Sequence, residues 1–443
     1  MSDAAKPAET ASGGVLERFF DLSGNGTSVR TEVIAGITTF LTMAYIIFVN
    51  PNILSAAGMP KEAVFVATCL AAAIATLIMA LYANYPIALA PGMGLNAFFA
   101  FAVVGSMGFT WQQALAAVLI SGVLALIISI LPIRAWLVNS IPNSLKLATS
   151  AGIGFFLAII ALQGAGLVVD HPATLVTHGK LLAAAPLLAL LGFAIIAALN
   201  QLKIVGATII GIIVVTLLGI PLGVASISGI VDVPPSLAPT FLQLDFSRVA
   251  EGTFWIVALT MFFVDFFDTA GTLIGVAYRA KLLDKDGNLP RLRQALIADS
   301  SATTIGALLG TSNTTSYIES ASGVTAGGRT GLASVVTAAC FLLALFFAPL
   351  AGSIPPYATA AALLFVAVVM ARALAEVDWD DLTEAAPVAV TAVTMPLTYS
   401  IAVGLGLGFI TYVVVKILAG RWKEITPAVA LLAVIFAIML PMI

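Results

Sequence analysis

Charged residues are scarce in this 443-residue chain, where Asp, Glu, Lys and Arg together make up only 9% of the sequence. Soluble domains carry about 25% charged residues, so the composition excludes an ordinary soluble protein. Hydrophobic residues account for 60% of the chain, and the mean hydropathy is +1.09. Apolar runs of about 20 residues, which is the length of a membrane-spanning helix, recur between short polar stretches. The sequence therefore predicts a polytopic helical membrane protein.

Cysteine and histidine are almost absent. The two cysteines, Cys69 and Cys340, lie inside apolar runs, so we expect neither a disulfide framework nor a metal cluster. No basic stripe accompanies the net charge of −3, and we expect no nucleic-acid partner. Residues 1–30 are polar and lack the apolar core of a signal peptide, so we expect a cytoplasmic tail.

The apolar runs form two sets of seven. The expected spans of the first half are 33–49, 63–82, 97–105, 112–132, 147–168, 183–199 and 205–221; those of the second half are 252–277, 292–310, 316–326, 331–351, 357–375, 385–397 and 400–418. Because seven is odd, the second half must insert upside down relative to the first. Residues 222–250 read as an exposed connection, and the run 425–443 is left over.

Positive charge predicts the orientation. With a cytoplasmic N-terminus, most Lys and Arg residues of the connections fall on the cytoplasmic side. These are Arg30, Arg134, Lys146, Lys203, Arg279, Lys281, Lys285, Arg291, Arg293 and Arg329.

Two short segments occupy corresponding places in the halves, APGMGLNAFF (90–99) and TSNTTSYIES (311–320). Interrupted segments of this kind indicate a transporter binding site at the repeat interface; the alternative is coincidence among similar apolar runs. The first contains G-x-G-x-x-A but lacks the βαβ unit of a dinucleotide site. We expect Gly92 and Gly94 to allow unusual backbone dihedral angles, unless they only permit close helix packing. Asn96 would offer an amide, and Phe98 or Phe99 a ring for stacking.

Acidic residues at membrane depth are the strongest functional signal. A carboxylate there costs at least about 2.5 kcal/mol unless it faces a protein interior or an aqueous cavity. Asp265 and Asp268 lie in the span 257–278, where Thr272 follows Asp268 by one helical turn. Such acids can accept hydrogen bonds from a heterocycle or hold a proton; the alternative is a structural role, and the sequence leaves that of Asp265 open.

Two further acids belong to the second half. Glu319 follows the run of hydroxyl and amide residues from Thr311 to Ser316, which is tolerated at depth only where it is buried or lines a cavity. Asp299 lies in the span before it, and we expect it mainly to orient the substrate-bearing helices. Tyr45 is a weaker candidate for lining the cavity, with helix packing as its more ordinary role.

Four motifs in order carry a resemblance to a known family: TTFLTMAYIIFVNP, APGMGLNAFFAF, FVDFFDTAGTLIGVA and TSYIESASGVTAGGRTGL. They resemble the AzgA-like purine permease branch of the nucleobase:cation symporter-2 (nucleobase-ascorbate transporter) family, and the resemblance extends from about residue 15 to 424. It implies an all-α membrane fold of about fourteen helices in two inverted repeats of seven, with short extended segments in helices 3 and 10. The implied organisation is a cytoplasmic tail (1–30), a core domain (31–135 and 251–352), a gate domain (146–222 and 356–420) and an extra C-terminal hydrophobic helix (425–443).

The resemblance also implies a function, the import of adenine, or of hypoxanthine and guanine, by proton symport with elevator-type alternating access. Matched by motif, the substrate-binding residues are Asp268, Glu319, Asn96, Thr272 and Phe98, and proton coupling falls on Glu319, Asp268 and Asp299. The relatives that carry uracil or xanthine generally have Glu where this chain has Asp268, and the shorter side chain would suit a larger, bicyclic purine. No cofactor is implied beyond the coupling proton. The implied setting is the inner cell membrane, with a homodimer formed through the gate domain.

Two other classes remain as alternatives. An anion carrier for sulfate or bicarbonate could share the fold, although an anion would meet Asp268 and Glu319. An integral membrane enzyme could use paired acids as general acid and base, but no nucleophile or metal-ligand set accompanies them, so we expect no enzyme.

Overall fold

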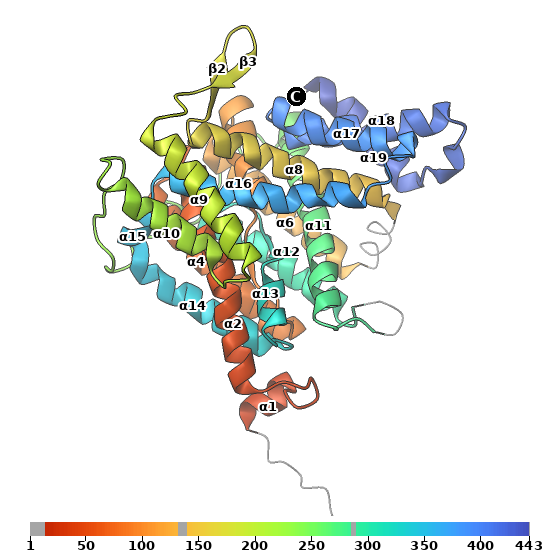
Figure 1. Ribbon diagram of the computed structural model, residues 1–443. Coiled ribbons are helices and arrows are strands. Elements are labelled where there is room, and N and C mark those ends of the chain that lie inside the picture. Colours follow the sequence, from red (N-terminus) through yellow and green to blue (C-terminus); the bar gives the residue numbers. More distant parts are fainter. Residues whose placement is uncertain (1–13, 132–139, 285–288, 443) are drawn as a thin grey trace, which may run out of the picture.

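The computed structural model describes residues 14–131, 140–284 and 289–442 (Figure 1). Helices dominate the described part, and eight of them are long and apolar enough to cross a membrane by length and composition. Five shorter apolar helices accompany these eight. The prediction of an all-α polytopic membrane protein is confirmed.

The first half runs from helix α1 to helix α10. Its elements are α1 (Val15–Phe20), α2 (Val29–Met43), α3 (Ile46–Ser55), α4 (Lys61–Ile78), the π-helical η1 (Met79–Ala83), β1 (Leu89–Pro91), α5 (Met93–Ala97), the π-helical η2 (Phe98–Ser106), α6 (Trp111–Ile130), α8 (Asn143–Gly164), β2 (Val168–His171), β3 (Leu175–His178), α9 (Ala184–Gln201) and α10 (Ala207–Gly219). Polar residues set several boundaries: the Ser28 side chain caps α2, and Thr110 forms a capping box with Gln113 at the start of α6.

The second half repeats this order. Its elements are α11 (Gly252–Arg279), α12 (Leu292–Leu309), β4 (Thr314–Ser316), α13 (Ser320–Thr325), α14 (Gly331–Ala344), η3 (Leu345–Phe347), α15 (Ala348–Ser353), α16 (Pro356–Ala371), η4 (Arg372–Glu376), α17 (Leu382–Leu397), α18 (Ile401–Leu418), η5 (Trp422–Glu424), α19 (Pro427–Met439) and η6 (Leu440–Met442). In each half, two long spans precede a three-residue strand and a short helix.

The two strands meet in the middle of the molecule. β1 pairs antiparallel with β4, with Ala90 opposite Thr315, and the backbone N–H of Gly92 extends the pairing by bonding the Asn313 carbonyl at 2.9 Å. All six strand residues are buried. The predicted extended segments in helices 3 and 10 are therefore confirmed. Their pairing adds a backbone connection between the two halves, which also pack on each other through helices such as α6 with α12 and α8 with α16.

The expectation for Gly92 and Gly94 is wrong. Gly92 has an ordinary extended backbone, with φ −75° and ψ 120°, and Gly94 lies inside helix α5. Close packing explains both glycines instead: a Cβ at Gly94 would lie 2.3 Å from Cγ2 of Ile153, and one at Gly92 would lie 2.9 Å from Cγ2 of Thr315. The expected short span 97–105 is also longer than predicted, because α5 and η2 together cover Met93–Ser106.

The helices pack in two groups. In one group, which we call the core group, α12 packs on α4 and α6, α14 on α2 and α4, and α11 on α6. In the other, the gate group, α8 packs on α16 and α17, α9 on α10 and α16, and α17 on α18. Figure 1 shows gate helices α8, α16 and α17 across the upper part of the view, with α2, α12 and α14 of the core group below them.

Two terminal segments also pack on the bundle. Phe20 and Leu22, in the predicted cytoplasmic tail, are buried against Leu332 of α14. The last apolar run forms α19, which packs on α18, and its Phe436 ring stacks on Phe409 at a centroid distance of 5.7 Å. Both segments are thus part of the folded body.

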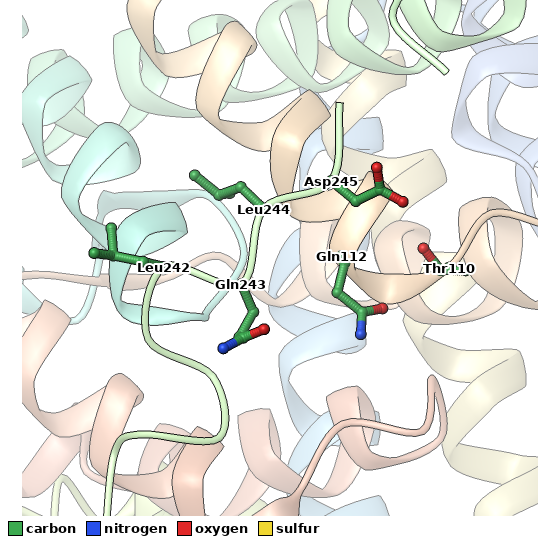
Figure 2. A pocket seen from close by; sticks show the side chains of 6 residues that line it. All are labelled: Thr110, Gln112, Leu242, Gln243, Leu244 and Asp245. Atoms are coloured by element: carbon green, nitrogen blue, oxygen red, sulfur yellow. The ribbon is translucent and has the colours of Figure 1, made fainter. Parts of the chain in front are cut away.

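The connection 222–250 is mostly exposed, as the sequence predicts, but it contacts the end of α12. Thr240 is fully buried and donates a hydrogen bond to the Leu309 carbonyl at 3.1 Å, and the Leu242 N–H bonds the Leu308 carbonyl at 2.8 Å. The connection therefore folds over the end of α12. A pocket of about 330 Å³ lies between the connection and the start of α6 (Figure 2). Its lining residues are Thr110, Gln112, Leu242, Gln243, Leu244 and Asp245.

Candidate functional site

Glu319 lies where the paired strands give way to helix. It is the residue before α13, three positions after the end of β4, and its side chain is partly exposed. The Tyr45 hydroxyl donates a hydrogen bond of 2.5 Å to its Oε1 atom, and the Thr42 hydroxyl reaches its backbone carbonyl at 3.4 Å. Tyr45 is 1% exposed and lies in the break between α2 and α3. The structure thus gives Tyr45 a polar partner beyond helix packing.

Asp268 is the partly exposed acid of α11. It lies within electrostatic range of the carboxylates of Asp299 and Glu319. The described residues supply no hydrogen bond to its carboxylate. Thr272, one turn further along α11, is buried on the same side of the helix. Asp268 is therefore the acid whose oxygens are most available to a ligand.

The Asp299 carboxylate is hydrogen-bonded to strand β4. Its Oδ1 atom accepts hydrogen bonds from the Ser316 N–H at 3.0 Å and the Ser316 hydroxyl at 2.9 Å, and its Oδ2 atom accepts from the Thr269 hydroxyl at 2.7 Å. The Thr269 hydroxyl is also 2.8 Å from that of Thr315. The side chain is 1% exposed. Asp299 thus fixes the end of β4 relative to α11 and α12.

Asp265 makes similar contacts one turn before Asp268. Its Oδ2 atom accepts from the Thr303 hydroxyl at 2.9 Å and from the Asn313 side chain at 3.4 Å. The Thr303 hydroxyl is also 3.0 Å from the Thr314 carbonyl, where it can bond the β4 backbone. These bonds hold the polar run before β4, which is a structural role for the acid whose role the sequence leaves open.

Asn96 and Phe98 lie on the first short segment. Both are buried, and the Asn96 Oδ1 atom accepts a hydrogen bond from the Ser312 hydroxyl. The Asn96 Nδ2 group has no hydrogen-bond partner among the described residues. Phe98 begins η2 and is 1% exposed. Of the predicted residues, Asp268 and Glu319 are therefore the two with partly exposed side chains.

Two residues that shape this region, Tyr317 and Thr303, are not among those predicted from the sequence. The Tyr317 hydroxyl bonds the Pro91 carbonyl at 2.5 Å, which ties the end of β4 to the end of β1. Thr303 connects Asp265 to β4, and its position one turn after Asp299 on an apolar helix is a signal that could have indicated it. Among the residues with a described placement, no three His, Cys, Asp or Glu side chains form a metal-binding group.

Comparison with known proteins identifies the family. A profile described as "Permease family", for xanthine and uracil permeases, matches residues 30–407. The chain is 54% identical to a putative permease of Methanocaldococcus jannaschii (96% of this chain, 97% of the relative) and 48% identical to the adenine permease AdeP of Escherichia coli (97% and 96%). The chain belongs to the xanthine/uracil permease family. The guanine/hypoxanthine permease PbuG of Bacillus subtilis is 45% identical to it, over 95% of this chain and 98% of the relative.

These relatives confirm the resemblance to nucleobase:cation symporter-2 proteins that the four motifs indicate. This permease is accordingly an integral membrane transporter. The enzyme alternative is dropped, because the relatives are permeases.

Solved structures confirm the fold of the permease. The transmembrane domain of the cyanobacterial bicarbonate transporter BicA superposes with a TM-score of 0.66, at 18% identity, over 86% of this chain and 97% of that domain. The murine anion transporter Slc26a9 in its inward-facing state gives a TM-score of 0.64, at 11% identity, over 95% of this chain and 74% of that chain. The permease thus has the fold of inverted repeats with core and gate domains. At these identities the likeness concerns the fold alone.

Proposed function

We propose that this permease imports purine nucleobases by proton symport. The names of its relatives support the substrate class, because AdeP is an adenine permease and PbuG a guanine/hypoxanthine permease. The observation that carries the proposal is the placement of Asp268 and Glu319. Two acids within electrostatic range of one another, one on α11 and one just after β4, suit a ligand that presents N–H donors. Purines present such donors at ring nitrogens and exocyclic amines.

The neighbouring groups suit the rest of a purine. Asp268 and Glu319 would accept its N–H groups, and the Thr272 hydroxyl would assist from the next turn of α11. The unpartnered Nδ2 group of Asn96 would donate to a ring nitrogen or carbonyl. Phe98 would stack on the base. For a sulfate or bicarbonate anion the same two acids are unfavourable, because like charges repel.

Proton coupling would use the same acids. Protonation of Glu319 or Asp268 would remove a negative charge from the site and let the loaded protein move. Asp299 would take part through β4, because a change in its charge alters the bonds to Ser316 that hold the strand. The proton is the coupling ion, and no other cofactor is proposed.

Transport would proceed by an elevator-type movement of the core group along the gate group. The close contact of Gly94 with Ile153 lies on the boundary between the two groups, so it would have to slide or separate. We further propose a cytoplasmic N-terminus, insertion in the inner cell membrane, and a homodimer through the gate group. The core domain would be residues 31–135 and 251–352, and the gate domain 146–222 and 356–420.

Uptake measurements test the proposal. Cells that lack their own nucleobase permeases would express this chain and receive labelled adenine, hypoxanthine, guanine or uracil, with and without a protonophore. We expect saturable uptake of a purine that collapses with the protonophore, and its loss in Asp268→Asn and Glu319→Gln at unchanged membrane levels.

Asp170→Asn, in the exposed β2–β3 hairpin, is the matched control and should transport normally. Normal uptake by both site variants would contradict the assignment of the site. Uptake of labelled sulfate or bicarbonate, without purine uptake, would favour the anion carrier.

A further inference from the structure

An apolar groove lies on the core group, and none of its lining residues belongs to the paired strands. Its volume is about 580 Å³, and its lining is almost entirely apolar. The lining residues are Ile74, Leu77, Ile78, Leu81, Tyr82 and Ile297. Leu81 and Tyr82 are more than half exposed. In a membrane transporter, such a surface faces the bilayer.

The groove matches the direction and depth of a lipid chain. Ile74, Leu77, Ile78 and Leu81 recur every three or four residues, so they form one stripe along α4 and η1. At 1.5 Å per residue this stripe is about 10 Å long. One leaflet of a hydrocarbon core about 30 Å thick is about 15 Å deep. The stripe therefore spans most of a leaflet along a membrane-spanning helix.

Two arginines flank one end of the groove. Arg291 lies beside the segment that follows η1, with its guanidinium carbon 4.8 Å from the centre of the Tyr85 ring and its NH2 group 3.4 Å from the Asn84 carbonyl. Arg293 lies one turn before Ile297 on α12 and is exposed. It donates a hydrogen bond to the Ile130 carbonyl at 2.9 Å.

Neither arginine has an acidic partner within 4 Å in the part of the chain that the structure describes. Both therefore keep N–H donors for a ligand. A guanidinium is weakly hydrated and binds phosphate oxygens through parallel hydrogen bonds.

We propose that this groove is a binding site for one anionic phospholipid. One acyl chain would fill the apolar groove between α4 and α12, and the phosphate would meet Arg291 and Arg293 at its end. Basic groups beside membrane helices attract anionic head groups, and a lipid with no net charge lacks that electrostatic attraction. Both walls belong to the core group, so the lipid would brace the α4–α12 contact and move with that group.

The test uses the purified full-length protein in detergent. Phosphatidylglycerol or phosphatidylcholine with identical chains would be added, and native mass spectrometry would count the lipid that each protein retains. We expect preferential retention of phosphatidylglycerol and a rise in Tm with that lipid. Arg291→Gln and Arg293→Gln should each lower its retention about fivefold, which corresponds to about 1 kcal/mol per arginine.

Arg279→Gln is the matched control, because Arg279 is an exposed cation at the C-terminal end of α11, outside the groove. It should retain phosphatidylglycerol like the parent protein. Ile297→Trp tests the proposed acyl-chain site, since the larger side chain fills the groove and leaves both arginines in place. Equal retention of the two lipids by the parent protein would overturn the proposal, as would an undiminished preference in the double variant Arg291→Gln/Arg293→Gln. These measurements need no transport, so they stand apart from the purine proposal.

Discussion

The hydroxyl of Tyr45 donates a hydrogen bond of 2.5 Å to Oε1 of Glu319, although 274 positions separate the two residues in the sequence. Each lies at a break in a membrane-spanning element, Tyr45 between α2 and α3 and Glu319 between β4 and α13. Backbone irregularity at membrane depth is tolerated where it is buried in protein or lines a cavity. The bond therefore joins the irregular points of the two halves at the proposed substrate site.

Loss of that bond should impair transport more than folding. In Tyr45→Phe the ring remains and only the donor to Glu319 is removed. A hydrogen bond to a charged group contributes about 1.5 to 3 kcal/mol, so we expect purine uptake to fall at least about tenfold. Initial uptake rates at matched membrane levels would measure this. Tyr357→Phe, which removes a buried hydroxyl in the gate group, should leave uptake within about twofold; equal losses in both variants would mean that the Tyr45 bond has no special role.

Replacement of Asp299 should destabilise the protein as well as inactivate it. Asp299→Ala leaves the Ser316 N–H and hydroxyl and the Thr269 hydroxyl without their acceptor, and an unsatisfied buried polar group costs about 1 to 3 kcal/mol. We expect a Tm several degrees below that of the parent in detergent. Asp268→Asn should keep the parental Tm, because the described structure shows no hydrogen bond that depends on its charge. A normal Tm for Asp299→Ala would contradict the anchoring of β4.

Tyr399 offers a direct test of movement between the two groups. It lies in the turn between α17 and α18 with φ of 52°, a left-handed conformation that is costly for a tyrosine. Its ring packs edge to face on Phe101, at a centroid distance of 6.4 Å, and on Phe156 of the gate group, at 5.6 Å. Phe101 lies in η2, which packs on α6 of the core group. Its hydroxyl bonds the side chain of Gln163 in α8.

If the core group slides, a short thiol cross-linker between Phe101→Cys and Tyr399→Cys should stop uptake, and reduction should restore it. The pair Phe156→Cys and Tyr399→Cys is the control, because both residues belong to the gate group and its cross-link should leave uptake unchanged. Undiminished uptake by protein cross-linked between positions 101 and 399 would rule out movement at this contact.

Low pH should weaken the contact between Asp381 and Arg421 at the end of the gate group. Hydrogen bonds from the Thr383 hydroxyl and from Arg421 lower the pKa of Asp381 to about 2. The folded-state pKa is thus below the value of about 3.9 for an unfolded chain. The contact therefore stabilises the protein above about pH 4, and this stabilisation is lost as the pH falls toward 2.

We expect the Tm of the parent protein to fall more between pH 5 and pH 3 than the Tm of Asp381→Asn. Asp170→Asn should follow the parent, since Asp170 is exposed in the hairpin and outside this contact. Parallel pH profiles for the parent and Asp381→Asn would show that the Arg421 contact contributes nothing measurable.

The extent of sequence-based prediction differs between the elements. The starts of several spans are predicted accurately from the sequence. Helices α4, α12, α14 and α18 begin within two residues of their predicted positions. Apolar length is a local property, and lipid forces each such run into a helix. The role of the two glycines in the first short segment could not be predicted from the sequence. Their neighbours Ile153 and Thr315 come from distant parts of the chain, so no local signal separates a conformational role from a packing role.

The sequence by itself determined the membrane environment, the two sets of seven spans and the acids placed inside them. Each follows from the hydropathy of a short stretch and the cost of a charge in lipid. The tertiary structure decided how those acids divide their roles. Asp265 and Asp299 are held by Thr303, Thr269 and Ser316, whereas the Asp268 and Glu319 side chains remain partly exposed. That division depends on the register of β1 against β4, which is fixed by pairing between segments more than 200 residues apart.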